Sequence, residues 1–227
     1  MRSERDVKTR ITDIFSKASE NHFLKVINGL TVSNDVKRLE FTVLGVNYAL
    51  EVVEGEVKVS VSDPLGREED SSRLIVYMLN AVERVLEGKT SCGKGGLIKF
   101  AQLEGGSTAQ LYEKRIANYL AAEMDGSNLP EIEGAVKLIG GYMVEHPNAT
   151  WSFEVSPFCG VRFRVAYWQG EEDMPSNAAL FLGGEAKEAA VPVDELIVIA
   201  EMAVNRFVLF YRKIAGKKPK LFESLYL

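Results

Sequence analysis

The chain of 227 residues is 46% hydrophobic and 26% charged, and its formal net charge is −5. These values are typical of a globular protein. The negative charge argues against general binding to nucleic acid or to an anionic membrane, because both favour a basic protein face. Two cysteines are too few for a structural zinc site or an iron–sulfur cluster held by this chain alone. We therefore expect no metal site, no nucleic-acid partner and no membrane partner.

The expected compartment follows from three features of the sequence. The first twenty residues carry several charges and lack the apolar run of a secretion signal. The most apolar stretch, residues 196–211, is interrupted by Glu201 and Arg206 and is shorter than the about 20 residues that cross a bilayer. Cysteine is scarce. Together these features predict a cytoplasmic protein with reduced thiols.

Hydrophobic periodicity predicts a helix, three strands and a second helix in the first part of the chain. Apolar residues recur at helical spacing over residues 5–20. They alternate with polar residues within residues 41–52, which indicates two short strands joined by a turn. A third alternating strand, residues 57–61, precedes a helix that runs to about Glu87.

The second part of the chain shows the same order of predicted elements. Residues 112–124 have the spacing of a helix. The segments 151–155 and 161–167 alternate as strands, and a further apolar run follows at residues 178–182. A last helix contains residues 196–207.

The last helices of the two parts are similar in sequence. Leu74–Val85 and Leu196–Phe207 are identical at six of twelve positions, and the strands before them also align, with Phe41 matched to Phe153. Amphipathic helices can also resemble one another simply because apolar spacing restricts the residue types. We predict an α+β fold of two pseudo-repeats, each a helix, three antiparallel strands and a helix, packed into one compact body.

The predicted organisation has three segments. Residues 1–88 form the first pseudo-repeat, residues 89–110 a glycine-rich connector, and residues 111–227 the second pseudo-repeat. Neither half can bury the apolar faces of its helices alone, so we expect the halves to be inseparable parts of one globular unit.

No complete catalytic or cofactor motif is present, so catalytic residues and cofactor stay unknown. The run from Gly93 to Gly96 resembles part of a phosphate-binding loop but lacks the full spacing. Cys92 lies close to Lys94, which favours a thiolate. The two histidines, His22 and His146, have no recognisable catalytic context.

Paired glycines, a tryptophan and an acidic run suggest a ligand site. Glycine permits close backbone approach, a tryptophan ring offers a stacking face, and carboxylates can contact polar groups or a cation. Alternatively, the glycines only form turns and the acids are solvated. The predicted ligand-binding residues are Glu104, Gly105, Gly106, Gly140, Gly141, Trp168, Glu171, Glu172 and Asp173.

Several segments also carry a family resemblance. Glu104-Gly105-Gly106, the run from Tyr167 to Pro175, and Leu180-Phe181 resemble an uncharacterised prokaryotic domain family, which covers about residues 20–210. The resemblance implies an anaerobic bacterium or archaeon, and some family members are fused to a four-cysteine iron–sulfur module like that of corrinoid iron–sulfur proteins. Leu182 stands where the family tends to have an aspartate, so no role of that aspartate carries over.

We expect a small-molecule or cofactor-binding module in anaerobic metabolism. The expected partner is a small molecule or an iron–sulfur or corrinoid partner protein, as the resemblance implies. Two alternatives stay open. One is an enzyme of unrecognised type with its site at the acidic loop, and the other is a structural or protein-interaction domain.

Overall fold

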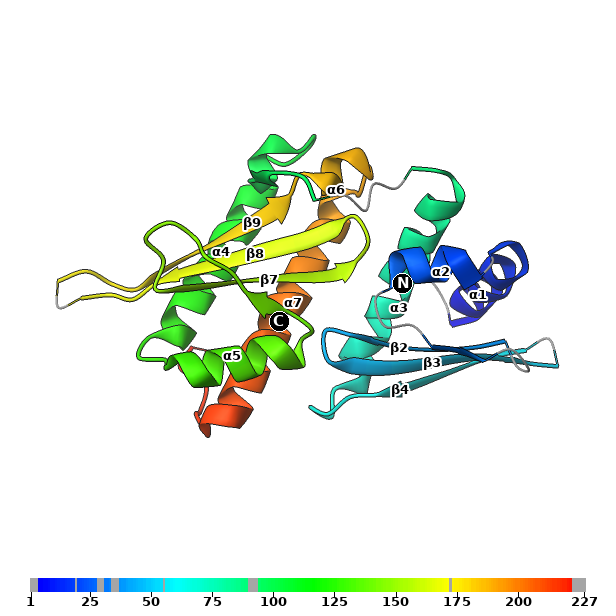
Figure 1. The fold of residues 1–227 in the computed structure, drawn as a ribbon, viewed down its shortest axis with the longest axis horizontal. Helices are drawn as coiled ribbons and strands as arrows, with labels where there is room; N and C mark the ends of the chain where they lie inside the picture. Colours follow the sequence, from blue (N-terminus) through cyan, green and yellow to red (C-terminus); the bar gives the residue numbers. More distant parts are fainter. Residues whose placement is uncertain are drawn as a thin grey trace.

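The computed structural model describes residues 4–18, 20–27, 31–33, 37–54, 56–89, 94–171 and 173–221. In these ranges the chain forms helices and two antiparallel sheets, which confirms the expected α+β fold (Figure 1). The first sheet has the strand order β1-β2-β3-β4 and the second the order β5-β9-β8-β7-β6. Each sheet is therefore centred on three strands that are consecutive in the chain.

The first sheet buries one face under helices. Its elements are α1 (Glu4–Lys17), α2 (Glu20–Val26), β1 (Thr31–Ser33), β2 (Lys37–Val43), β3 (Val46–Val53), β4 (Glu56–Ser62) and α3 (Glu68–Leu86). Phe41 lies opposite Tyr48, and both are buried, whereas the neighbouring Thr42 is exposed. This alternation arises because successive side chains of a strand point to opposite faces. Leu44 and Gly45, both with positive φ, form the tight β2–β3 turn.

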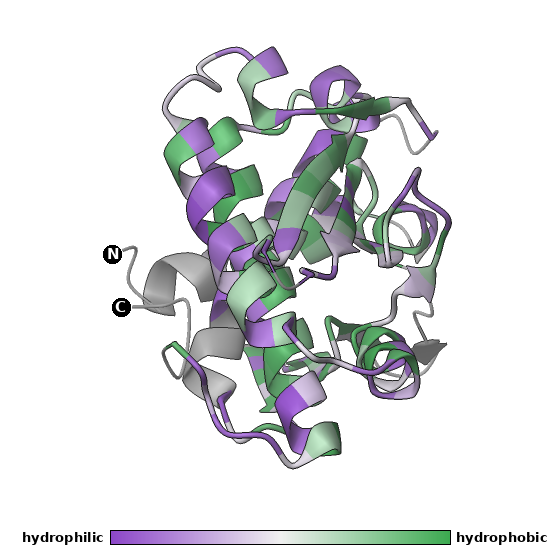
Figure 2. Cartoon of the chain, turned by 90° about the vertical axis from the view of Figure 1, so that its left-hand side faces the viewer, coloured by the Kyte–Doolittle hydropathy of each residue, from purple (hydrophilic) through white to green (hydrophobic). Residues whose placement is uncertain are grey.

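The second sheet packs one face against α4 and α7. Its elements are β5 (Leu97–Ile98), the 3-10 helix η1 (Phe100–Gln102), α4 (Ala109–Met124), α5 (Leu129–Leu138), β6 (Tyr142–Met143), β7 (Trp151–Phe158), β8 (Val161–Trp168), β9 (Asn177–Gly183), α6 (Glu185–Glu188) and α7 (Val193–Ala215). The ring of Phe207 on α7 lies 4.7 Å from that of Phe153 and 6.0 Å from that of Trp151 on β7. The central strands are largely hydrophobic, whereas the helices alternate between hydrophobic and hydrophilic stretches (Figure 2).

The order helix, three-stranded meander, helix occurs in both parts, as α1, β2–β4, α3 and as α4, β7–β9, α7. The structural equivalence of the two parts stays a prediction, which superposition of one part on the other tests. The expected match of Phe41 to Phe153 is wrong in register. Phe41 pairs with Tyr48, whose counterpart counted from the hairpin turn is Phe163, and Phe163 pairs with Val155. The counterpart of Phe41 in this count is therefore Val155, two residues along β7 from Phe153.

The two parts are joined through α7. Arg206 on α7 donates from Nη1 and Nη2 to the Oδ2 and Oδ1 atoms of Asp63, both at 2.8 Å, and from Nε to the carbonyl oxygen of Leu44. The side chains of Arg206 and Asp63 are only 5% and 0% exposed. Near the start of α7, Glu195 accepts hydrogen bonds from Asn80 and Arg84 of α3 at 2.9 and 2.7 Å. One hydrophobic cluster runs through both parts.

The state of the cysteines differs from the expectation. Cys159, in the turn between β7 and β8, is disulfide-bonded, so the prediction of a reduced thiol is wrong for this residue. Cys92, the chain's only other cysteine, lies outside the described residues. Separately, none of the helices in the described ranges has the length and apolar character needed to cross a membrane.

Replacing Arg206 by alanine should lower the free energy of unfolding by about 3–5 kcal/mol, because the buried carboxylate of Asp63 loses its partner. Urea unfolding followed by circular dichroism measures the change. Arg38→Ala is the matched control, since Arg38 pairs with Glu40 at the surface and such pairs contribute about 0–1 kcal/mol. Equal effects of the two substitutions would contradict a joining role for Arg206.

Candidate functional site

A cleft of about 920 Å³ lies between α5 and the segment that leads from β6 into β7. This size is within the range of about 300–1,000 Å³ that is common for small-molecule sites. We call it the α5 cleft. Its lining residues are Leu129, Glu133, Met143, Val144, Glu145, His146, Pro147, Ala149, Thr150, Trp151 and Ser152.

Helix α5 forms one wall of the cleft, and residues at both of its ends define where the helix starts and stops. The side chain of Asn128 accepts a hydrogen bond from the backbone N–H of Glu131 at 3.1 Å, and Pro130 occupies the first turn. The helix ends at Leu138; Gly140, two residues further on, has a φ of 73°, and the N–H of Gly141 donates to the carbonyl oxygen of Val136. The last turn of the helix therefore directs the chain into β6.

The opposite wall is fixed by charged side chains on the face of the second sheet that points away from α7. Glu154 is nearly fully buried, and its Oε1 accepts hydrogen bonds from Arg162 and Arg164 while its Oε2 accepts one from Tyr142. Burial alone raises the pKa of Glu154, but these hydrogen bonds and the two positive charges bring it below its ordinary value. Arg164 also donates to the carbonyl oxygen of Glu145, which lines the cleft.

His146 lies between the cleft and the aromatic residues of the second sheet. Its ring centroid is 5.7 Å from that of Trp168 and 5.0 Å from that of Phe181. Burial, with the positive charges of Arg164 and Lys99, lowers the pKa of His146. At neutral pH the imidazole is therefore uncharged. Its Nδ1 atom is buried and has no hydrogen-bond partner among the described residues.

Trp151 contributes a second nitrogen without a partner. The residue is 6% exposed, and its ring stacks on that of Tyr167 at 4.7 Å with an interplanar angle of 14°. Within the described part of the chain, its Nε1 atom has no acceptor. Leaving a buried donor unpaired costs about 1–3 kcal/mol, so this group needs an explanation. Both unpartnered nitrogens belong to residues that line the α5 cleft.

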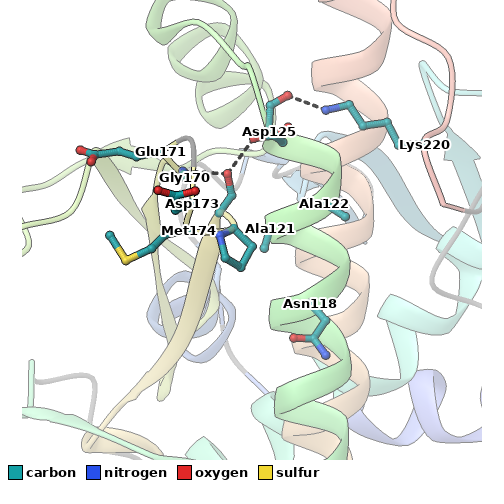
Figure 3. Close-up of a pocket in the computed structure, with 11 residues that line it drawn as sticks. Asn118, Ala121, Ala122, Asp125, Gly170, Glu171, Asp173, Met174 and Lys220 are labelled. Atoms are coloured by element: carbon teal, nitrogen blue, oxygen red, sulfur yellow. Dashed lines mark hydrogen bonds between the residues drawn. The ribbon is translucent and has the colours of Figure 1, made fainter.

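A second hollow, of about 890 Å³, separates the end of α4 from the β8–β9 connection (Figure 3). We call it the acidic groove. Glu171 and Asp173 lie on one side, and Asn118, Ala121 and Ala122 of α4 lie on the other. Both carboxylates are exposed, as expected for the solvated alternative.

Polar contacts close one end of the acidic groove. Asp125, which follows α4, accepts hydrogen bonds from Ser176 at 2.7 Å and from Gln169 at 2.9 Å. These two hydrogen bonds lower the pKa of Asp125. The ammonium group of Lys220 donates to the backbone carbonyl oxygen of the same residue (Figure 3). Through these hydrogen bonds, Asp125 holds the β8–β9 connection against α4.

The structure divides the residues that the sequence grouped into one site. Trp168 contacts His146 beside the α5 cleft, whereas Glu171 and Asp173 line the acidic groove. Glu172 lies outside the described residues. Residues 104–106 lie before α4, whose 16 residues span about 24 Å, so they are far from the groove at its other end.

The paired glycines have packing roles that the structure makes visible. A Cβ on Gly106 would lie 1.8 Å from the carbonyl oxygen of Phe100, and a Cβ on Gly141 would lie 2.8 Å from that of Glu154. Gly105 and Gly140 have positive φ. Gly140 and Gly141 therefore shape the α5 cleft indirectly, through the bend between α5 and β6.

Sequence reasoning missed the two residues that the cleft brings together. The sequence gives His146 no recognisable catalytic context and places Trp151 only in a strand. The available signal was the start of α5, where Asn128 and Pro130 mark a helix N-terminus. In the described ranges, no group of three or more His, Cys, Asp or Glu side chains is placed to hold a metal ion.

Fold and site together define an α+β protein with two antiparallel sheets and an open cleft at the end of the second sheet. The chain belongs to the family defined by DUF3786, a domain of unknown function, whose model matches residues 23–206. The comparisons with curated proteins and with solved structures each found no match. The expected membership of an uncharacterised family is confirmed, and the link to anaerobes and iron–sulfur modules stays a prediction.

The close contact at Gly106 gives a prediction about its role. Gly106→Ala should lower the free energy of unfolding by about 1–3 kcal/mol, because the new Cβ would overlap backbone atoms of Phe100. Thermal unfolding measures the effect. Gly96→Ala is the control, since no atom lies within 4 Å of its added Cβ. A Gly106→Ala protein as stable as the control would show that this segment adapts freely.

The lowered pKa of His146 predicts a pH dependence of stability. An unfolded histidine has a pKa of about 6.5, so the unfolded state binds more protons in the window between the lowered pKa and about 6.5. The free energy of unfolding should therefore fall as pH drops through this window, and His146→Gln should remove that part of the dependence.

Proton NMR gives a direct measurement of the His146 pKa. The imidazole signal that His146→Gln removes should titrate with a midpoint below about 6.5. Urea unfolding of both proteins across the same pH window provides the matching stability measurement. A midpoint at or above the unfolded value would contradict the packing described for His146.

Proposed function

We propose that this protein is a small-molecule-binding module and that its ligand occupies the α5 cleft. The observation that carries the proposal is a cleft of ligand size lined by both apolar residues, such as Leu129 and Met143, and polar residues, which include a histidine of lowered pKa. This combination is the usual character of a binding site for a small molecule.

The α5 cleft supports this function better than the acidic groove does. In the groove, Asp125 already accepts two side-chain hydrogen bonds, and Glu171 and Asp173 are exposed. Exposed acids in a loop are usually solvated, and their interactions with a ligand are screened. In the cleft, by contrast, His146 and Trp151 carry buried nitrogens that have no partner among the described residues.

Trp168 connects the proposal to the ligand site expected from the sequence. Its ring contacts His146 edge-on and so supports one side of the cleft. We therefore assign Trp168 a positioning role rather than that of a stacking face. Binding to an iron–sulfur or corrinoid partner protein, and a place in anaerobic metabolism, stay predictions from the family resemblance.

Filling the cleft should abolish ligand binding. Ala149 lines the cleft, and Ala149→Phe should remove any small molecule that co-purifies with the wild-type protein, because the ring occupies its volume. Mass spectrometry of the molecules released after anaerobic purification is the measurement. Ala122→Phe, which places the same side chain in the acidic groove, is the matched control and should retain the ligand.

The opposite result is equally informative. Loss of the ligand in Ala122→Phe together with retention in Ala149→Phe would assign binding to the acidic groove and favour the alternative of an enzyme with its site there. Retention in both variants would place the ligand elsewhere on the protein.

A further inference from the structure

The first sheet ends in a long edge strand. Proteins generally protect the edges of their sheets with short strands, proline, bulges or charged side chains, because an open edge can pair with another chain. Among the described residues, the edge strands β1, β5 and β6 have only three, two and two residues. Strand β4 is the fourth edge strand and has seven residues, Glu56–Ser62.

The second sheet protects the part of β9 that extends past β5. There, Lys99 donates to the carbonyl oxygen of Leu180 at 3.3 Å. The N–H of Ala178 donates to the side chain of Asn177 at 2.9 Å. Side chains thus occupy backbone groups that an added strand would need.

Strand β4 is straight and regular by comparison. It pairs with β3 over its whole length without a shift of register, and no proline interrupts it. Figure 1 shows β4 at the lower margin of the first sheet, in agreement with its terminal place in the strand order. Every second residue of an edge strand directs its N–H and C=O groups away from the neighbouring strand. The outer side of β4 therefore offers a row of hydrogen-bonding groups to a further strand.

The side chains of β4 alternate between the two faces of the sheet. Three valines face the helices, and three hydrophilic residues face solvent. The valines are Val57, Val59 and Val61, and the hydrophilic residues are Lys58, Ser60 and Ser62. Val59 and Val61 pack against the core but stay partly exposed. A strand that continues the sheet should therefore present apolar residues to the helix-covered face and avoid a cation opposite Lys58.

A second copy of β4 meets both requirements in one antiparallel register. A twofold axis at Val59 places Val57 opposite the second copy's Val61, and the two Val59 side chains opposite each other. On the solvent face, the same axis places Lys58 opposite the second copy's Ser60. All three valines are then matched with valines, and no like charges face each other.

The neighbouring registers are less favourable. An axis at Lys58 would place two ammonium groups opposite each other. An axis at Ser60 would place Val57 opposite the second copy's Asp63, whose carboxylate is buried and paired with Arg206. An axis between two residues would bring valines opposite hydrophilic residues, because a shift of one residue exchanges the faces of a strand.

We propose that two copies of this chain associate through antiparallel pairing of their β4 strands about an axis at Val59, so that their first sheets form one continuous sheet. The inference is independent of the proposed function, because the α5 cleft lies beside the second sheet. Pairing of two strands of seven residues gives an interface at the low end of the usual size range. The dimer should therefore dissociate on dilution.

Substitutions at Ser60 test the surface and its charge pattern. Ser60→Lys would place a second ammonium group opposite each Lys58, and Ser60→Glu would place a carboxylate there. The first should raise and the second should lower the dissociation constant of the dimer by about twofold to thirtyfold, because two such cross-strand pairs form in each dimer. Sedimentation velocity from micromolar to near-millimolar protein measures both changes. High salt should reduce them.

Thr42→Lys and Thr42→Glu are the matched controls. Thr42 is exposed on the same face of the sheet as Ser60, but it lies on β2, two strands away from the edge. The same changes of charge at this position should leave the dissociation constant unchanged. Circular dichroism of all four variants checks that the fold is retained.

A cysteine at the axis tests the register. Residues directly opposite each other in an antiparallel pair have Cα atoms about 4.5–5.5 Å apart, which suits a disulfide bond. Val59→Cys should therefore form a covalent dimer on mild oxidation, beyond any dimer formed by the wild-type protein. Ser60→Cys is the control, because its two cysteines would be offset by two residues along the paired strands and should not cross-link.

Three results would overturn the inference. A wild-type protein that stays monomeric at near-millimolar concentration would leave the edge of β4 open or to a different partner. A dimer whose dissociation constant responds to neither Ser60 substitution would be formed by another surface. A dimer that cross-links through Ser60→Cys and not through Val59→Cys would have a different register from the one proposed.

Discussion

The buried guanidinium of Arg206 is the interaction on which the rest of the structure depends. Removing a charged group from water is costly unless it is paired and hydrogen-bonded, and Arg206 on α7 meets that requirement with Asp63 and the carbonyl oxygen of Leu44, both from the first part of the chain. Helix α7 is thereby tied to the first sheet while its other side packs against the second. The position of α7 in turn sets that of α5, because the two helices are packed together. The position of α5, one wall of the cleft, thus depends on the ion pair between Arg206 and Asp63, which are far from α5 in the sequence.

A second buried charge system fixes the other wall. Glu154 is desolvated by the sheet and its surroundings, and three side chains compensate for this by donating to its two oxygens. Tyr142 and Arg164 belong to this set, and they attach β6 and the carbonyl of Glu145 to the sheet. Burial, together with the positive charges of Arg164 and Lys99, lowers the pKa of the neighbouring His146. Arg164 therefore both pairs with Glu154 and contributes to the lowered pKa of His146 beside the cleft.

Local patterns in the sequence were sufficient for most of the fold. Alternation of apolar residues located the central strands of both sheets, because a strand with one buried face has a period of two. Helix α5 was missed since Pro130 and Gly134 interrupt its pattern, although Asn128 marks its start. The displaced match of Phe41 to Phe153 has another origin, since a shift of two residues along a strand leaves the alternation of apolar and polar residues unchanged.

The site was harder to predict because it depends on tertiary packing. Trp168 and the run of acids are close in sequence, yet the end of β8 separates them toward different hollows of the surface. His146 and Trp151 come to one cleft only when α5 packs beside the β6–β7 connection. The spacing of residues in the sequence does not predict that these two residues line the same cleft.

The distribution of hydrogen bonds among the buried aromatic residues gives the unpaired indole its significance. Tyr167 donates to Gln169 or Ser176, the hydroxyl of Tyr119 contacts Arg212, and that of Tyr211 contacts Lys217. Each of these polar ends has a partner near the edge of the core. Trp151 lies in the same layer, stacked on Tyr167, and differs in having none among the described residues. Aromatic packing against Tyr167, Phe153 and Phe207 thus determines the position of the indole, whereas hydrogen bonds at the edge of the core fix the tyrosines.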